Sequence, residues 1–395
     1  MATLIIRNLG PIVEAELDLK KVNVFMGPQS SGKSTIVKVL STCRWIEKQS
    51  YFDSFNLHNY HLKDLLIEFH RFDESFFNDD TNIDFKSDDI RILYTKELGC
   101  EIISPYETYE FLVEKINNIK YIPAERNLAS AVPNIIKYAD NKDNLLSFLF
   151  DWFEARQFYK EHNAVNILNL NASYYYNKEQ ERDVVSLSNN VKFPLKSASS
   201  GLQSIIPLQL LVSHSCKYLY DRIPPLSFNT IQNIKELYNR SLNSPFMNES
   251  HQKILEGILS YEKNLYNFTQ LFIEEPEQNL YPETQKELVN SLIGAIQYNS
   301  LNHRLALTTH SPYILYALNN SMMYYLVKDK LSEESRAKVV GMNGINPKDV
   351  AIWEIANGRI KNIQDEDGLI STNYFDSIMQ GIMDEFYTLL EYYGK

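Results

Sequence analysis

The sequence has little cysteine and lacks any hydrophobic run long enough to cross a membrane. Three cysteines, Cys43, Cys100 and Cys216, lie far apart among 395 residues and form no CxxC pattern. This spacing argues against a zinc site or a disulfide framework and is typical of a reducing cytosol. No apolar stretch approaches the ~20 residues of a membrane-spanning helix, and the amino terminus lacks the features of a signal peptide. We therefore predict a cytoplasmic protein with no membrane contact.

Positive charge is also scarce. The chain carries 39 Lys and Arg against 50 Asp and Glu, a formal net charge of −11, and has no basic block. Bulk charge therefore disfavours nonspecific binding to duplex DNA, although a local basic groove for nucleic acid stays open. Hydrophobic residues make up 44 %, which is ordinary for a globular protein, and the length allows two or three domain-sized units.

The most informative stretch fits the phosphate-binding loop pattern GxxxxGK[ST] and reads Gly27-Pro28-Gln29-Ser30-Ser31-Gly32-Lys33-Ser34-Thr35. A buried-strand pattern, 22–26, precedes it and a helical pattern, 36–46, follows, so the required strand–loop–helix context is present. Glycines let backbone N–H groups turn toward an anion, and the helix N-terminus adds a positive dipole end. Lys33 can reach the β- and γ-phosphates, and the Ser34 hydroxyl can bind Mg²⁺. A glycine turn with a chance lysine is the weaker alternative.

Strand and helix patterns alternate along most of the chain. We expect strands at 3–7, 12–19, 22–26, 120–123, 271–273 and 305–308, a hairpin about Asn189-Asn190, and helices at 145–161, 201–220, 282–298 and 312–318. This alternation predicts an α/β fold with a parallel sheet between helices. Composition shifts divide the chain into a core of 1–49, 120–220 and 267–395, an inserted lobe at 50–119, and a helical insertion at 221–266.

A second chemical segment is the apolar run Leu271–Ile273, which ends in two adjacent acids, Glu274 and Glu275. Neighbouring side chains on a strand point in opposite directions, so the two carboxylates can have different roles. Glu274 would hold Mg²⁺, and Glu275 would act as general base for the attacking water. A solvated acidic turn after a strand is the alternative interpretation.

Two further polar segments end or begin core elements. Ser199, Ser200 and Gly201 open a helix, where they form either an anion site or a simple N-cap. His310 follows the strand at 305–308, at the edge where ligands of open α/β sheets bind. It can contact a γ-phosphate or orient a water, although a single histidine is more often structural.

Together these motifs resemble an ABC-type ATPase head. Gly27–Thr35 looks like a Walker A loop, Glu274-Glu275 like a Walker B pair, Ser199-Ser200-Gly201 like the signature, and His310 like the switch histidine. Other segments are similar to the OLD-like and SMC-like AAA ATPases. Residues 275–282 resemble the EPExxLHP stretch of these proteins, and residues 8–12, 121–126 and 309–312 resemble further segments of them.

The resemblance implies an ABC-type P-loop ATPase head: a mostly parallel sheet flanked by helices, with an antiparallel β part and helical insertions. Two such heads sandwich two ATP molecules with Mg²⁺, each signature meeting the other copy's γ-phosphate, so a homodimer or higher oligomer is implied. The sequence departs from the pattern at Glu274, where Asp is commoner, and at Tyr281, where His is usual. The signature is Ala-Ser-Ser-Gly, so we expect slow or partner-stimulated hydrolysis. Glu125 and Arg126 are the candidates for the Q-loop position.

Stand-alone OLD-like ATPases resemble components of bacterial anti-phage systems such as PARIS and Septu, in which an ATPase assembles with a nuclease from a neighbouring gene. The leading hypothesis is therefore a sensor or regulatory ATPase with a separate effector protein. The alternatives are an SMC-type DNA-maintenance ATPase that clamps DNA and a non-hydrolysing, ATP-gated scaffold. The acidic cluster Asp365-Glu366-Asp367 after His310 is interpreted as a loop, so we expect no nuclease activity in this chain itself.

The last helical pattern carries an apolar stripe, with residues Phe375, Ile378, Met379, Ile382, Phe386, Leu389, Leu390 and Tyr393. Such a stripe predicts packing on the chain's own sheet, and docking on a partner is the alternative.

Overall fold

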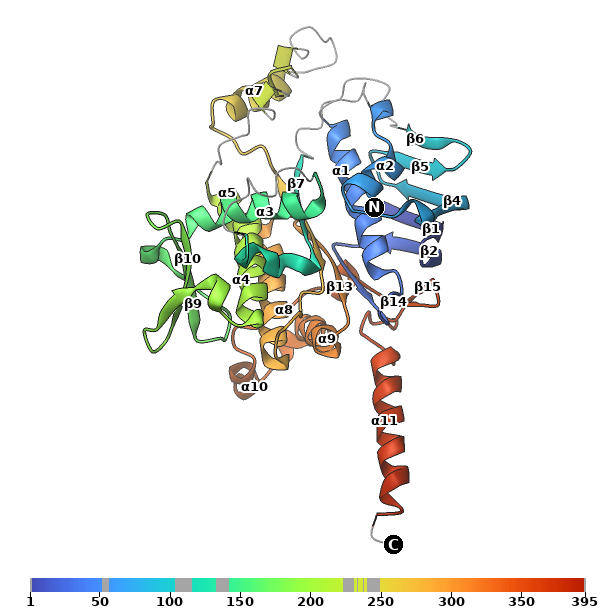
Figure 1. Ribbon diagram of the computed structural model, residues 1–395, viewed down its shortest axis with the longest axis vertical. Coiled ribbons are helices and arrows are strands. Elements are labelled where there is room, and N and C mark those ends of the chain that lie inside the picture. The colour runs from blue at the N-terminus through green and yellow to red at the C-terminus, as the bar shows by residue number, and fades with distance from the viewer. Residues whose placement is uncertain are drawn as a thin grey trace.

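A computed structural model describes most of the chain (Figure 1). The described residues are 2–51, 57–103, 116–132, 142–222, 231–232, 234–236, 238–239 and 249–393.

An eleven-stranded sheet organises the fold, in the order β6-β5-β4-β1-β2-β15-β14-β3-β13-β12-β7. One half consists of parallel strands: β14 (Val350–Ala356), β3 (Val22–Met26), β13 (Arg304–Thr309), β12 (Phe268–Glu274) and β7 (Asn117–Ile122). All five residues of β3 are buried, as expected for a strand covered on both faces. The carboxyl ends of these parallel strands form one edge of the sheet.

The other half of the sheet is antiparallel. It contains β1 (Ala2–Leu9), β2 (Ile12–Leu19), β4 (Phe77–Lys86), β5 (Arg91–Thr95) and β6 (Gly99–Ile103), while β15 (Arg359–Asn362) pairs antiparallel with β14. β4 to β6 belong to the segment 50–119, so its strands extend the main sheet. The proposed division into a core and two insertions stays a prediction, and only part of 221–266, including α7 (Glu249–Leu259), is described.

Helices cover both faces of the sheet and bury two apolar cores (Figure 1). One face carries α1 (Lys33–Ser50) and α2 (Leu62–Glu68). The other carries α3 (Asn144–Ala155), α4 (Ser200–Ser213), α8 (Pro282–Ile296) and α9 (Pro312–Val327). β3 contributes to both cores, because neighbouring side chains on a strand point to opposite faces. Phe25 packs into the core under α1 and α2, and Val24 packs into the core under α3, α4, α8 and α9. The predicted α/β architecture is confirmed.

A small antiparallel sheet lies beside this body, with β8 (Val165–Asn166), β9 (Ala172–Asn177), β10 (Arg182–Leu187) and β11 (Lys192–Pro194). It contains the hairpin predicted about Asn189-Asn190, with Asn190 at φ 65°. Two short helices are α5 (Leu219–Asp221), which continues α4 through a π-helical turn at 214–218, and α10 (Glu333–Lys338).

The predicted packing of the last helix on its own sheet is wrong. α11 (Tyr374–Leu390) is fully described and has no buried residue. Only its first turn packs on the body, where Tyr374 and Phe375 are partly buried; the rest extends away from the body (Figure 1). Within the described residues, no helix is long and apolar enough to cross a membrane.

Candidate functional site

The phosphate-binding loop lies between the carboxyl end of β3 and the start of α1 at Lys33. Two of its positions require glycine. Gly27 has φ 145° and Gly32 has φ 103°, which side chains rarely adopt. A Cβ atom at Gly27 would lie 2.3 Å from the Ile355 carbonyl oxygen, and one at Gly32 would lie 2.3 Å from Ile12 Cδ1. The loop conformation therefore depends on these two glycines.

A cavity of about 650 Å³ opens over this loop. Seven of the nine motif residues line it: Gln29, Ser30, Ser31, Gly32, Lys33, Ser34 and Thr35. The predicted catalytic residues Glu275 and His310 line it as well. The other lining residues are Gly10, Pro11, Lys38, Arg71, Phe72 and Phe76. The fold thus brings both predicted catalytic side chains to the loop, although they lie 240 residues or more away along the chain.

Lys33 is held by the loop itself. Its Nζ donates to the carbonyl oxygens of Gly27 at 2.9 Å and Pro28 at 2.6 Å, and to Ser31 Oγ at 3.4 Å. The side chain is buried, and burial lowers the pKa of Lys33 to about 8, against the opposing pull of Glu275 and Glu277. An anion in the cavity would favour the charged amine at this position.

Ser34, which lines the cavity, contacts Glu274, which does not line it. Ser34 Oγ donates to Glu274 Oε2 at 2.8 Å, and the Tyr121 hydroxyl donates to the other carboxylate oxygen. Hydroxyl and carboxylate oxygens are hard ligands of the kind that Mg²⁺ prefers. The pair predicted to hold a metal is therefore in direct contact, and its chemistry suits Mg²⁺. Tyr121 was not identified from the sequence as part of this pair.

Glu275 sits in a strained backbone conformation. Its φ is +44°, which a non-glycine residue adopts only where its surroundings enforce it. Its N–H donates to the Thr308 carbonyl at 3.1 Å. The fully buried guanidinium of Arg126 donates to the carbonyl oxygens of Glu274 at 2.8 Å and Glu275 at 2.7 Å, and to that of Ser204 at 3.2 Å. Arg126 thus fixes the turn that aims Glu275 into the cavity.

His310 faces the Glu275 carboxylate, with Nε2 3.2 Å from Oε1. This hydrogen bond holds the pKa of Glu275 below its usual range. A third acid, Glu277, holds the backbone of the histidine. Its Oε1 accepts from the backbone N–H of His310 at 2.6 Å and from Thr309 Oγ1 at 2.9 Å. Burial raises the pKa of Glu277. Glu275 is therefore suited to accept a proton at neutral pH, and Glu277 to position His310.

The three predicted signature residues lie at the start of α4, outside the cavity over the phosphate loop. Ser199 caps α4, its side chain accepting from the Leu202 N–H at 3.4 Å, and Ser199 and Ser200 are both exposed. A Cβ at Gly201 would lie 2.8 Å from the carbonyl oxygen of Asn279, so α4 begins close to the turn after β12. None of the three predicted signature residues lines the cavity over the phosphate loop.

The candidates for the Q-loop position do not line the cavity either. Glu125 pairs with the exposed Arg71 at 3.0 Å, and Arg126 holds the turn after β12. The positioning roles of Arg126 and Glu277 have no signal in the linear motif, because each depends on groups brought together by the fold.

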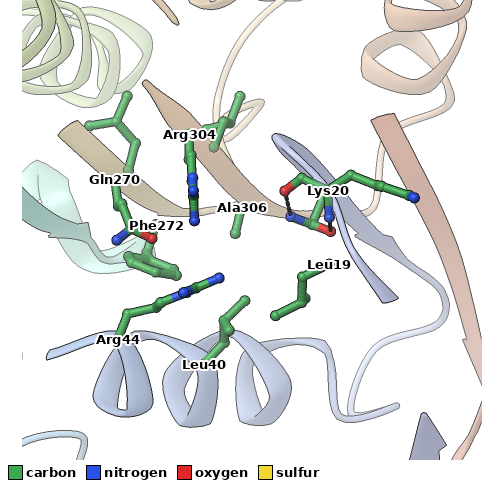
Figure 2. Close-up of a pocket in the computed structure, with 11 residues that line it drawn as sticks. Leu19, Lys20, Leu40, Arg44, Gln270, Phe272, Arg304 and Ala306 are labelled. Carbon is green, nitrogen blue, oxygen red and sulfur yellow. Dashed lines mark hydrogen bonds between the residues drawn. The ribbon is translucent and has the colours of Figure 1, made fainter. Parts of the chain in front are cut away.

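A second cavity lies at the opposite edge of the sheet, where the parallel strands begin (Figure 2). Arg44 extends into it from α1 and Arg304 from β13, near Gln270. Arg44 pairs with Glu47 at 2.7 Å, and the Arg304 guanidinium lies 5.2 Å from the centre of the Phe268 ring. No residue of the predicted site lines this cavity, so the chemistry discussed above is confined to the carboxyl edge.

Comparison with known proteins adds a family. A family model described as "AAA domain, putative AbiEii toxin, Type IV TA system" matches residues 22–315. No curated protein matches the chain.

Among solved structures, the SMC head domain from Thermotoga maritima is 9 % identical and covers 92 % of this chain and 98 % of its own, with a TM-score of 0.38. The Smc head domain with an extended coiled coil, bound to the C-terminal domain of ScpA and derived from Pyrococcus furiosus, is 9 % identical over 98 % of this chain and 100 % of its own, with a TM-score of 0.42. An ATP-binding cassette of an ABC transporter in its ADP conformation is 10 % identical over 93 % of each chain, with a TM-score of 0.34. These scores lie below 0.5, so the assignment depends on the family match.

Proposed function

The chain belongs to this AAA-domain family, whose fold implies nucleotide binding, and we propose that it binds ATP with Mg²⁺ and hydrolyses it slowly. One observation carries the proposal: Lys33, Ser34, Glu275 and His310 line a single cavity over the phosphate loop, and Ser34 contacts Glu274. No other cavity described above combines an anion-binding loop with a carboxylate–histidine pair.

Binding is assigned to the loop. Its backbone N–H groups and the α1 N-terminus would hold the α- and β-phosphates, and Lys33 would exchange its bonds to the Gly27 and Pro28 carbonyls for bonds to the β- and γ-phosphates. Ser34 and Glu274 would hold Mg²⁺, which neutralises charge on the phosphates when bound. The buried, partly desolvated amine of Lys33 makes this exchange favourable, because a phosphate compensates its charge more fully than a carbonyl does.

Hydrolysis is assigned to Glu275 and His310, which line the cavity. The Glu275 carboxylate would accept a proton from the water that attacks the γ-phosphorus, while the bond to the leaving ADP oxygen breaks. His310, held by Glu277, would orient the same water or contact the γ-phosphate. Arg126 contributes by fixing the strained turn on which Glu275 stands. The assay is phosphate release by the purified chain; turnover that persists in Lys33→Ala would refute the assignment.

We further propose that the functional unit is a dimer with composite sites. The placement of Ser199, Ser200 and Gly201 supports this, because they lie at the start of α4, with both serines exposed, and do not line the chain's own cavity. A second copy would supply them to the γ-phosphate, as the resemblance to ABC-type heads implies. An ATP-dependent change from monomer to dimer, measured by sedimentation velocity with and without ATP, tests this.

The proposed biological role is that of a sensor or regulatory subunit for a separate effector, a nuclease in an anti-phage defence system. This step rests on resemblance to stand-alone OLD-like ATPases. It is tested by affinity capture of the tagged chain from its native host with ATP or ADP present. A nuclease encoded by the adjacent gene and retained in one nucleotide state would support the role; a repair or recombination enzyme in its place would support a DNA-maintenance function.

A non-hydrolysing, ATP-gated scaffold is the second candidate. It is favoured by Glu274, whose two carboxylate oxygens are already engaged by Ser34 and Tyr121. ATP binding and dimerisation without measurable phosphate release, with and without the captured partner, would favour the scaffold over the ATPase.

A further inference from the structure

The helix α11 has no buried residue. From Ser377 to Leu390 every residue is exposed. The apolar stripe of α11 consists of Phe375, Ile378, Met379, Ile382, Phe386, Leu389, Leu390 and Tyr393. Within it Met379 is 61 % exposed, Ile382 and Phe386 are 55 % exposed, and Leu389 is 71 % exposed. A contiguous apolar surface of this kind on a soluble domain marks an interaction site.

Helical periodicity separates this stripe from a polar face. Ser377, Gln380, Asp384 and Glu391 lie on the opposite side of the helix, where Gln380 Nε2 donates to Asp384 Oδ1 at 2.7 Å. A helix of 17 residues is marginal in water without packing along its length. Within residues 2–393, as far as they are described, that packing stops after the first turn, so packing on a partner surface would stabilise the remainder.

The first turn of α11 is attached to the body near the phosphate loop. The Tyr374 N–H donates to Glu354 Oε2 at 3.2 Å, and Glu354 on β14 lies beside Met26, the residue before Gly27. The Tyr316 hydroxyl of α9 donates to Asp376 in the first turn, and α9 starts two residues after His310. From this edge of the sheet the helix, ~25 Å long by its rise per residue, extends beyond the body (Figure 1).

The charge of α11 indicates which kind of surface its apolar stripe can pack against. Its segment from Tyr374 to Tyr393 contains Asp376, Asp384, Glu385 and Glu391 and no Lys or Arg. Anionic membranes attract basic amphipathic helices and repel acidic ones. A lipid surface is therefore disfavoured, and a protein surface is favoured.

We propose that the apolar stripe of α11 packs against a second copy of this chain when two copies close on ATP. The inference rests on the proposed function, in which the second copy approaches the carboxyl edge of the sheet, the edge from which α11 extends. Twofold symmetry would repeat the contact, so each dimer buries two stripes. Because the first turn of α11 is attached to β14 and α9, the orientation of the helix is fixed relative to the phosphate loop and to the segment that carries His310.

The test uses the full chain with Glu275→Gln, which is expected to hold ATP without turnover, in three forms: unchanged, with Ile382→Asp/Phe386→Asp in the stripe, and with Ser377→Asp/Thr388→Asp on the polar face. Sedimentation velocity at saturating ATP and Mg²⁺ gives the dimer dissociation constant. The stripe variant should dimerise about a hundredfold more weakly, because it places charge at the centre of an apolar contact. The polar-face variant adds the same charge and should match the unchanged chain. ATP affinity, measured for all three at concentrations at which the chain is monomeric, should be equal, since none of these side chains lines the cavity.

Three results would overturn the inference. Equal dimer affinity in all three forms would remove α11 from the interface while leaving the proposed ATP dimer intact. Absence of any ATP-dependent dimer would remove the proposed dimer and the inference together. Cosedimentation of the unchanged chain with phosphatidylserine vesicles, lost in the stripe variant, would assign the stripe to a membrane.

Discussion

Replacing Glu275 by Gln separates ATP binding from hydrolysis. Gln keeps the size of the side chain and a hydrogen bond to His310, 3.2 Å away, but it cannot accept a proton. Because the bond from His310 lowers the pKa of Glu275, the carboxylate is charged at neutral pH and available as a base. A positioned general base contributes about 10²–10⁴-fold to rate, so the variant should lose about 3–5 kcal/mol of transition-state stabilisation at 1.36 kcal/mol per decade.

The assay is phosphate release in single- and multiple-turnover modes, beside ATP affinity measured by calorimetry. Affinity should stay within a few-fold of wild type, and the ATP-bound dimer should persist. Glu283→Gln, an exposed acid in the first turn of α8, is the matched control and should turn over normally. Wild-type turnover by Glu275→Gln would refute the base assignment, and lost ATP affinity would show that the carboxylate holds the site together instead.

Four further results are expected. Lys33→Ala should weaken ATP binding by about a hundredfold, since a charge-assisted hydrogen bond contributes about 1.5–3 kcal/mol; retained micromolar affinity in calorimetry would contradict the loop assignment. With the pKa of Lys33 lowered to about 8, the charged amine predominates below pH 8, so ATP affinity should fall from pH 7 to 9.5; a flat profile would count against it. Glu274→Gln should weaken ATP affinity about tenfold in Mg²⁺ and leave affinity in EDTA unchanged; equal losses in both would exclude a metal role. Arg126→Met should lower the free energy of unfolding by at least about 3 kcal/mol, because the carbonyl oxygens of residues 123, 204, 274, 275 and 276 lose their donor, whereas Arg359→Met, an exposed control, should change it by less than about 0.5 kcal/mol; equal urea midpoints for the two variants would contradict this.

The sequence predicts those parts of the site that are written in short linear motifs. Residue type and spacing identify the two motifs, Gly27 to Thr35 and Glu274-Glu275. The alternating strand and helix patterns around them predict an α/β fold. His310 is found because it follows a core strand. Their roles stay predictions, but the structure brings these residues to one edge of the sheet.

What the sequence does not predict depends on distant partners. Arg126 meets a carbonyl 78 residues away on α4 and others about 150 residues away after β12, which no local pattern encodes. β14 and β15 were also missed, although their signal is local: the apolar run Val350–Ala356 is followed by the turn Asn357-Gly358. The stripe of α11 was correctly predicted as helical, but periodicity alone cannot say whether an apolar face meets its own sheet or another molecule.

Mixed-chain complementation tests the composite ATP site most directly. Lys33→Ala weakens ATP binding and keeps the signature, whereas Ser200→Glu keeps the loop and places a negative charge where the partner's γ-phosphate would lie. Each chain alone should release no phosphate above background. An equimolar mixture should regain about a quarter of wild-type turnover, because half of randomly formed dimers carry one intact site of two. A mixture as inactive as its components, or full activity in Ser200→Glu alone, would contradict a site shared between two copies.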